Sequence, residues 1–482
     1  MKILLLNPQN PPPKNLKSTS PGCIVKGNRS FYPPLGLLYL ASSIQKNTSY
    51  SVKILDCLIN QLTYEEIRSD ILAYNPDVVG MTIVTFNLFG CFTVANIVKE
   101  CEKELNKRIY VVAGGPHTIT FPNETAKLGP IDFVLTGEGE FTFLSLLNNL
   151  ENHDVLKTIP GIYYLKCGEL VKGPPPIWIE DIDSISMPDR RLLDYKKYSD
   201  TSAGGDVMTT ILSSRGCPYK CVFCNRLANH GSKIRNASAE YVIKEIEDCM
   251  NLGICEFYFI DDLFTNNKKR LITICDYIKN KKLQIKFDII SRVNTIDEDM
   301  IRSLKDAGCR SIGFGVESGV QRVLNRIKKG ITLEQAEKAF KTAKRHRLET
   351  VAFFMIGHPG ETADDIRQTI KFAKKLDPDY AWFYITIPNP NTELYKEGLE
   401  RGIIENDVWI KYAEKPYLNI TQPRWVENFS ESELAELLNE CYRGFYFRPY
   451  YIYRQVASVK NFKALKKKLY TGIKLLLQQA GK

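Results

Sequence analysis

The sequence predicts an α/β protein with an N-terminal doubly wound, Rossmann-like sheet, an incomplete (β/α)6 TIM-type barrel and a helical C-terminal extension. Two observations predict this class. Runs of Val, Ile and Leu alternate with segments of helical periodicity on both sides of a proline-rich stretch. A chain of 482 residues is also too long for one ordinary core. We expect domains at residues 1–150 and 206–390, a linker at 151–205 and an extension at 391–482.

The N-terminal region alternates predicted strands and helices. The strand candidates are Lys2–Leu6, Val52–Leu55, Val78–Ile83, Ile109–Ala113 and Phe133–Leu135. Helical spacing is present in Leu35–Gln45, Tyr64–Tyr74, Phe92–Leu105 and Glu140–Leu150. This alternation is typical of a doubly wound parallel sheet, in which ligands bind outside the carboxyl ends of the strands.

Glycine-rich loops follow three of these predicted strands. They are Gly80-Met-Thr-Ile-Val-Thr85, Gly114-Gly-Pro-His117 and Gly137-Glu-Gly-Glu140. Glycine lets the backbone approach a bulky ligand closely, but it also forms tight turns. The loops alone therefore leave a ligand site and simple turns as open alternatives.

Residues 151–205 are expected to link the two domains. A short hairpin around Cys167-Gly168 precedes the run Pro174-Pro175-Pro176 and the segment Met187-Pro-Asp-Arg-Arg191. Clustered prolines favour an extended connection over a core element.

Strand candidates again alternate with helical runs between residues 206 and 390. The strands are Met208–Ser213, Glu256–Ile260, Lys286–Ile290, Ser311–Val316, Val351–Ile356 and Tyr380–Ile387. The helical runs include Glu240–Asn251, Arg270–Lys279, Leu333–His346 and Ala363–Lys375. This repetition predicts an incomplete parallel barrel, whose catalytic groups lie at the C-terminal strand ends.

Three cysteines directly follow the first barrel strand. Cys217, Cys221 and Cys224 lie in the run Ser214-Arg-Gly-Cys-Pro-Tyr-Lys-Cys-Val-Phe-Cys-Asn-Arg226. A cubane iron–sulfur cluster normally takes four thiolates, so three ligands leave one iron open to bind a further group. A closed zinc site needs a fourth ligand, which neither Cys249 nor Cys255 supplies at regular spacing. The alternative is that the three cysteines are small structural hydrophobes.

Composition restricts the class of protein further. Hydrophobic residues make up 44% of the chain and charged residues 25%, as in globular proteins. No signal peptide precedes the 13 scattered cysteines, so we expect a reducing, cytoplasmic setting. No apolar stretch reaches the length of a membrane span. The net charge of +10 comes without a recognised nucleic-acid-binding module, so we expect no nucleic-acid partner.

With these motifs in order, the chain resembles the cobalamin-binding class of radical S-adenosylmethionine (SAM) enzymes, which includes the anaerobic oxidative cyclase of chlorophyll synthesis and hopanoid methylases. The resemblance covers everything except the C-terminal extension. The matching motifs are Pro33-Pro-Leu-Gly-Leu-Leu-Tyr-Leu-Ala41, Gly114-Gly-Pro-His117, Gly137-Glu-Gly-Glu140, Phe259-Ile-Asp-Asp-Leu-Phe264, Gly313-Phe-Gly-Val-Glu-Ser-Gly319 and Met355-Ile-Gly-His-Pro-Gly-Glu361.

The resemblance implies roles for residues at the barrel strand ends. The three cysteines would ligate a [4Fe–4S] cluster whose open iron binds the amino and carboxylate groups of SAM. Asp261 or Asp262 would accept hydrogen bonds from the SAM ammonium group, and Arg292 would pair with its carboxylate. The remaining candidates are Phe223 and Gly357 at the adenine, Ser291 beside Arg292, and Glu317 at the ribose hydroxyls. For the carboxylates, the alternative is a solvated loop or a helix cap.

Cobalamin is the second cofactor that the resemblance implies. Its candidate binding residues are Thr82, Gly114, Gly115, His117, Gly137, Glu138 and Gly139. Many cobalamin domains carry a histidine that ligates cobalt from below. The corresponding loop here, Asp56-Cys-Leu-Ile-Asn-Gln61, has none, so cobalamin would bind without that lower ligand. We interpret His117 as a turn histidine rather than an axial ligand.

The function implied is reductive cleavage of SAM to a 5′-deoxyadenosyl radical, followed by methylation of an unactivated carbon. The cofactors supply the chemistry and the protein positions them. An external electron donor of the flavodoxin or ferredoxin type is expected. One alternative is an oxidative or ring-forming enzyme without methyl transfer, and a second is a cobalamin-binding sensor without turnover.

The C-terminal extension carries an aromatic run, Phe445-Tyr-Phe-Arg-Pro-Tyr-Tyr-Ile-Tyr453, and a lysine-flanked apolar stripe within Lys460–Leu477. Such a stripe suits a membrane surface and hence a lipid or isoprenoid-like substrate. A terminal helix that packs on the barrel explains the same pattern. The sequence leaves both alternatives open.

Overall fold

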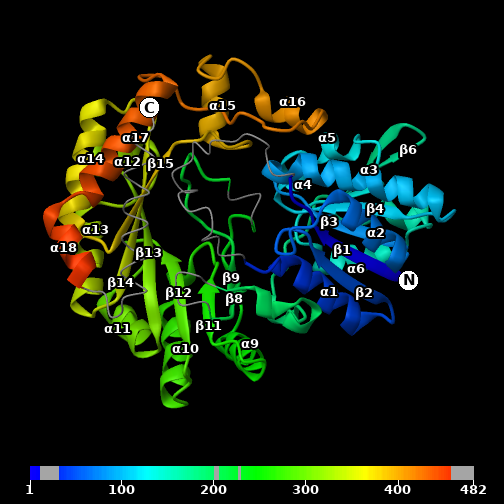
Figure 1. The fold of residues 1–482 in the computed structure, drawn as a ribbon, viewed down its shortest axis with the longest axis horizontal. Helices are drawn as coiled ribbons and strands as arrows, with labels where there is room; N and C mark the ends of the chain where they lie inside the picture. Colours follow the sequence, from blue (N-terminus) through cyan, green and yellow to red (C-terminus); the bar gives the residue numbers. More distant parts are fainter. Residues whose placement is uncertain (11–31, 200–205, 226–229, 458–482) are drawn as a thin grey trace.

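The computed structural model describes residues 1–10, 32–199, 206–225 and 230–457. It contains a mainly parallel and a fully parallel sheet that lie side by side (Figure 1). The α/β class with an N-terminal doubly wound sheet, a parallel barrel and a helical C-terminus is confirmed. No helix in the described ranges combines the length and the apolar composition needed to cross a bilayer.

The N-terminal sheet has seven strands in the order β2-β1-β3-β4-β5-β6-β7. The first five strands are parallel, and β6 and β7 add an antiparallel hairpin at one edge. Their bounds are β1 (Lys2–Asn7), β2 (Ser51–Asp56), β3 (Val78–Thr82), β4 (Tyr110–Gly114), β5 (Phe133–Leu135), β6 (Ile162–Lys166) and β7 (Glu169–Lys172). The strand order reverses beside β1, and ligands of doubly wound sheets bind at such a reversal.

Helices cover both faces of this sheet. The side chains of β1 alternate between two hydrophobic cores. Ile3 and Leu5 belong to the core that contains α1, and Leu4 and Leu6 belong to a second core. A strand buried on both faces has the continuous apolar sequence observed here. The helices are α1 (Leu35–Asn47), α2 (Tyr64–Tyr74), α3 (Leu88–Glu104), α4 (Pro116–Thr120), α5 (Pro122–Ala126), α6 (Gly139–Leu147) and α7 (His153–Leu156).

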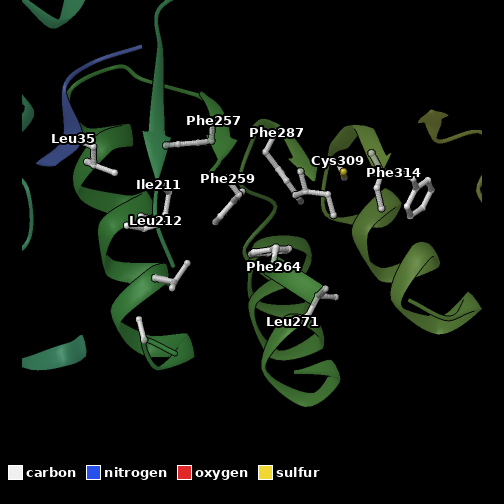
Figure 2. Close-up of a cluster of buried hydrophobic side chains, with 14 of the residues drawn as sticks. Leu35, Ile211, Leu212, Phe257, Phe259, Phe264, Leu271, Phe287, Cys309 and Phe314 are labelled. Carbon is white, nitrogen blue, oxygen red and sulfur yellow. The ribbon is translucent and has the colours of Figure 1, made fainter. Parts of the chain in front are cut away.

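The barrel sheet is parallel and open, in the order β15-β14-β13-β12-β11-β8. All six predicted strands are present, as β8 (Met208–Ile211), β11 (Glu256–Phe259), β12 (Lys286–Ser291), β13 (Cys309–Glu317), β14 (Glu349–Ile356) and β15 (Tyr380–Ile385). The helices along its outer face are α9 (Ala239–Asn251), α10 (Lys268–Asn280), α11 (Glu298–Asp306), α12 (Gln321–Arg326), α13 (Leu333–Arg345) and α14 (Ala363–Leu376). Figure 2 shows Phe257, Phe259 and Phe287 of this sheet in the core with Phe264 and Leu271.

The described part of the C-terminal extension packs on both domains. Helices α15 (Glu393–Glu400) and α16 (Val408–Glu414) lie along one end of the molecule (Figure 1), and the Tyr412 hydroxyl accepts a hydrogen bond from Phe89 N–H. Helix α17 (Glu431–Tyr446) packs against the edge strand β15 and α14, and α18 (Pro449–Ala457) follows it. The predicted aromatic run is therefore largely helical, whereas the lysine-flanked stripe lies outside the described residues.

Candidate active site

The three cysteines lie in a loop whose base is a short antiparallel ladder. Strands β9 (Ser214–Arg215) and β10 (Arg235–Asn236) pair across residues 216–234, which we call the cysteine loop. Gly216 adopts a φ of 92°, and a Cβ there would lie 2.1 Å from the Lys233 carbonyl oxygen. Only glycine therefore lets the chain leave β9 at this angle and reach Cys217.

The cysteine side chains suit a metal cluster. All three are free thiols, and burial raises the pKa of Cys217 and raises that of Cys224 to about 12. Thiolate ligands at such a site need nearby positive charge. Arg292 supplies it, because its Nη1 lies 3.6 Å from Cys221 Sγ while its guanidinium stacks on the Tyr219 ring.

Metal geometry alone does not identify this site. The described residues contain no group of three His, Cys, Asp or Glu side chains placed to hold a single metal ion. A cubane attaches each thiolate to a different iron, so its ligands need not converge on one point. The chemistry of three free thiols with one arginine fits a cluster that has an open iron.

The two neighbouring carboxylates after β11 have different surroundings. Asp261 is buried, and it accepts hydrogen bonds from Ser213 N–H, Ser213 Oγ and Ser214 Oγ. Asp262 accepts a hydrogen bond from Gly216 N–H at 3.2 Å and lies 3.4 Å from His230 Nδ1. Asp261 thus fixes the chain that enters the cysteine loop, and Asp262 is the carboxylate that borders the loop itself.

The ends of β12 and β13 carry three further candidates. Ser291 Oγ contacts Thr265 Oγ1 at 2.5 Å, and Arg292 Nη2 donates to the Lys329 carbonyl oxygen. Glu317 lies in a β-bulge with a φ of 70°, in the left-handed region that is strained for residues other than glycine. Its Oε1 accepts a buried hydrogen bond from Lys329 Nζ at 2.7 Å.

A further loop follows β14. Gly357 N–H and His358 N–H both donate to Glu361 Oε2, and burial raises the pKa of Glu361 to about 7. His358 is also buried, which lowers its pKa to about 3, and its ring centroid lies 6.3 Å from that of Phe223. Its Nδ1 contacts Thr386 Oγ1, whereas Nε2 has no partner among the described residues. The structure therefore places Phe223 near His358, the residue that follows Gly357.

Sequence reasoning missed three residues of this region. Lys329 is an ordinary lysine of a basic stretch, and nothing in the sequence pairs it with Glu317. Glu361 closes the motif Met355-Ile-Gly-His-Pro-Gly-Glu361, so the motif was a signal for it. Arg215 immediately precedes the cysteine loop, but its role depends on contacts with the other domain, described below.

The glycine loops of the N-terminal domain line one cavity of about 300 Å³. It lies at the carboxyl ends of β1, β3, β4 and β5 and includes six of the seven predicted residues: Thr82, Gly114, Gly115, Gly137, Glu138 and Gly139. Residues of the barrel side complete the lining: Leu212, Arg215, His230 and Ile260. A larger hollow of about 690 Å³ between α1 and α9 contains none of the predicted site residues.

Bare backbone faces this cavity, as a bulky ligand requires. A Cβ on Gly36 would meet no described atom within 4 Å, and one on Gly114 would meet only the Leu135 carbonyl oxygen, at 4.0 Å. Both glycines line the cavity, so side chains there would fill ligand space. The cavity thus leaves backbone open to a ligand at two of its lining positions.

His117 is the one predicted residue of this group that does not line the cavity. It is fully buried near the start of α4, and burial lowers its pKa to about 3. Its Nδ1 lies 3.2 Å from Thr85 Oγ1. Asp56, in the loop that lacks the expected histidine, accepts hydrogen bonds from Asn7 Nδ2 and the Tyr198 hydroxyl.

Comparison with known proteins agrees with this geometry. Residues 24–147 match the family model of the B12 binding domain, and residues 211–373 match that of the radical SAM superfamily. An uncharacterised methyltransferase, PH0819 of Pyrococcus horikoshii, is 38% identical over 89% of this chain and 91% of its own length. The anaerobic magnesium-protoporphyrin IX monomethyl ester cyclase of Rubrivivax gelatinosus is 28% identical over 82% of this chain and 70% of its own.

Solved structures share the fold. The cobalamin-dependent SAM radical enzyme OxsB, with aqua-cobalamin bound, superposes with a TM-score of 0.74 at 19% identity over 99% of this chain and 72% of its own. The radical SAM methyltransferase TsrM from Kitasatospora setae, with tryptophan and a SAM analogue bound, superposes with a TM-score of 0.70. It is 19% identical over 84% of this chain and 77% of its own. The chain therefore belongs to the cobalamin-binding radical SAM enzymes, whose cofactors are a [4Fe–4S] cluster, SAM and cobalamin.

Proposed function

We propose that this enzyme methylates an unactivated carbon of an apolar small molecule. The observation that carries the proposal is the shared cavity: glycine loops of the cobalamin domain and barrel residues Leu212, Arg215 and Ile260 line one space. The cysteine loop starts one residue after Arg215. When bound, the cluster with SAM supplies a 5′-deoxyadenosyl radical that removes hydrogen from the substrate, and methylcobalamin supplies the methyl group. One substrate carbon can then face both cofactors.

The protein's own residues would hold and shield these groups. Arg292 places positive charge beside Cys221, and Asp262 borders the same loop. Glu317, already buried against Lys329, would present a carboxylate oxygen to the ribose hydroxyls. Leu212 and Ile260 give the shared cavity an apolar wall, which excludes water from a radical reaction.

Exposed apolar side chains on the barrel strands support an apolar, lipid or isoprenoid-like substrate. Ile260 is 38% exposed and Tyr384 is 41% exposed, although both lie at the ends of strands in the barrel sheet. Tyr384 also stacks on Trp382, with the ring planes 11° apart. Side chains of this kind would give an apolar substrate a surface to contact. Methyl transfer is the activity that the name of the Pyrococcus relative states.

Two partners belong to this proposal. An external one-electron donor of the flavodoxin or ferredoxin type would reduce the cluster. A membrane surface is the second, because α18 exposes Tyr450, Ile452 and Tyr453 next to the lysine-rich C-terminus. Truncation after residue 454 would then reduce sedimentation with anionic vesicles, while cluster and cobalamin loading stay unchanged. Equal sedimentation of both forms would show that the lysine-rich C-terminus does not hold the enzyme on the vesicles.

The decisive experiment is anaerobic turnover of the reconstituted enzyme with hydroxocobalamin, a reductant, SAM labelled in its methyl group and extracted cellular lipids. Methylation predicts formation of 5′-deoxyadenosine together with a product that is heavier by one labelled methyl in place of hydrogen. A product that has lost hydrogen without label would contradict methyl transfer. The Cys224→Ala variant should form neither product, and Cys167→Ala, on the exposed turn of the β6–β7 hairpin, should form both.

A further inference from the structure

Two arginines stand opposite each other at the base of the cysteine loop. Arg215 and Arg235 are register partners in the β9–β10 ladder, and their side chains are only 3% and 2% exposed. Like charges directly opposite each other in a ladder repel, and an uncompensated buried charge is costly. The base of the loop therefore requires carboxylates from elsewhere in the chain.

The cobalamin domain supplies both carboxylates. Glu138 accepts hydrogen bonds from Arg235 Nη1 at 2.7 Å and Nη2 at 2.9 Å, and it lies 3.2 Å from Arg215 Nη1. Glu140 accepts a hydrogen bond from Arg215 Nη2 at 2.6 Å. All four side chains are buried, and we call them the charge quartet. Planar, charge-assisted pairs of this kind fix relative position as well as adding energy.

The quartet also borders the cobalamin cavity. Arg215, Glu138 and Glu140 all line it, and the Arg215 guanidinium stacks over the ring of Tyr39, another lining residue. Arg215 Nε is buried and has no partner among the described residues. Buried donors without an acceptor are rare because each costs its desolvation free energy. An acceptor oxygen of a ligand in the cavity would give the Arg215 Nε–H its missing hydrogen-bond partner.

We propose that Arg215 is a positioning residue shared by the two cofactor sites. Its Nε–H donates to an amide carbonyl oxygen at the periphery of bound cobalamin. Its Nη groups, through Glu138 and Glu140, hold the base of the cysteine loop. Filling the cavity thereby fixes the loop that carries the cluster. Linkage is reciprocal, so cluster and cobalamin raise each other's affinity by the same factor. The inference rests on the two cofactors and is independent of methyl transfer.

The test is the binding of hydroxocobalamin to the full chain, followed anaerobically by absorption, with the cluster present and after its removal by chelation. We expect a lower Kd with the cluster than without it in the wild type. Arg215→Lys should raise the Kd of the cluster-loaded protein about tenfold or more and abolish the dependence on the cluster. Glu140→Gln, which has nearly the same shape, should keep the cobalamin contact but weaken the cluster dependence.

Arg190→Lys is the matched control. Arg190 is equally buried, donates to Glu245 at 2.6 Å and does not line the cavity. It should lose stability but keep the wild-type Kd and its cluster dependence. Any of three results would overturn the proposal. The Kd could be unchanged in Arg215→Lys, the wild-type Kd could be the same with and without the cluster, or Arg190→Lys could lose as much affinity as Arg215→Lys. If Arg215→Lys does not fold, Glu140→Gln decides, because loss of cluster dependence in a stable variant supports the coupling and its retention refutes it.

Discussion

Tyr442 and Phe383 exchange two hydrogen bonds: the tyrosine hydroxyl accepts from the Phe383 N–H at 3.2 Å and donates to its carbonyl oxygen at 3.0 Å. One turn later on α17, Tyr446 makes the same pair of bonds with Ala381. An exposed edge strand presents unpaired backbone groups to other chains. Two tyrosines on one helix thus replace the missing neighbour of β15 and end the barrel sheet.

We predict that Tyr442→Phe and Tyr446→Phe each lower the free energy of unfolding by about 1–3 kcal/mol, because each leaves a buried backbone N–H and C=O unpaired. Anaerobic urea denaturation would measure the loss. Tyr453→Phe, at a site 71% exposed, is the control and should leave stability unchanged. Wild-type stability in Tyr442→Phe would show that water replaces the hydroxyl at no cost.

Replacement of Cys217, Cys221 and Cys224 together by alanine should remove the iron–sulfur absorption and SAM cleavage. These three thiols share one loop, whereas the other described cysteines are scattered over both domains and the C-terminal extension. Iron and sulfide analysis after anaerobic reconstitution measures the result, with Cys167→Ala as the control that keeps the cluster. A full complement of iron and sulfide in the triple variant would refute the assignment.

Gly315→Ala should weaken SAM binding by about tenfold. The new Cβ would lie 2.6 Å from Glu317 Oε1 and 2.8 Å from Lys329 Nζ, so the buried pair must move. Equilibrium dialysis with SAM on the cluster-loaded protein checks this. Gly129→Ala is the control, since a Cβ there meets no described atom within 4 Å. Equal SAM affinity in both variants would mean that Glu317 does not contact the nucleoside.

Glu361 should make stability depend on pH. Its pKa is raised from 4.5 to about 7 by burial, so the folded chain holds this proton more tightly than the unfolded chain. The resulting stabilisation is complete below about pH 4.5 and is lost as the pH rises through 7. Glu361→Gln remains neutral, so its free energy of unfolding should rise relative to that of the wild type by about 2.5 kcal/mol between pH 5 and pH 8.

Unfolding free energies of both proteins at the two pH values test this expectation. Glu436→Gln, on the exposed face of α17, should show no comparable gain, because solvent screens its charge. A constant difference between wild type and Glu361→Gln at both pH values would show that the carboxyl is ionised throughout.

Cobalamin should bind without a protein imidazole below cobalt. The loop after β2 has no histidine, and buried His117 lies outside the cavity lining. Electron paramagnetic resonance of the cobalt(II) form should therefore lack nitrogen superhyperfine splitting from the protein. Splitting that disappears in a His117→Gln variant would identify His117 as a lower ligand after all.

Local pattern predicted the strands well, because each buried parallel strand is a compact apolar run such as Lys2–Leu6. It did not predict α11, which is short and largely polar between Glu298 and Asp306. The positions of the domain boundaries at residues 150, 205 and 390 stay predictions. The hairpin β6–β7, within the expected linker, extends the N-terminal sheet.

The sequence predicts site residues only where the residues that act together are close together in the chain. The three cysteines and the glycine loops are such cases. Sequence left Asp261 and Asp262 as equals, and only the fold separates them, because successive residues at a strand end point in opposite directions. Contacts such as Glu138 with Arg235, 97 positions apart, depend on how the domains meet and leave no local trace.

The charge quartet also orders events during synthesis. Glu138 and Glu140 leave the ribosome before Arg215 and Arg235, and N-terminal domains generally fold first. The folded N-terminal sheet can therefore keep its two carboxylates hydrated until the barrel is made, with little loss of free energy. The barrel differs, because the base of its cysteine loop buries two cations whose carboxylate partners, among the described residues, both come from the earlier domain. The first domain thus serves as an intramolecular template on which the later one matures, and a barrel expressed by itself should be a poor acceptor of iron and sulfide.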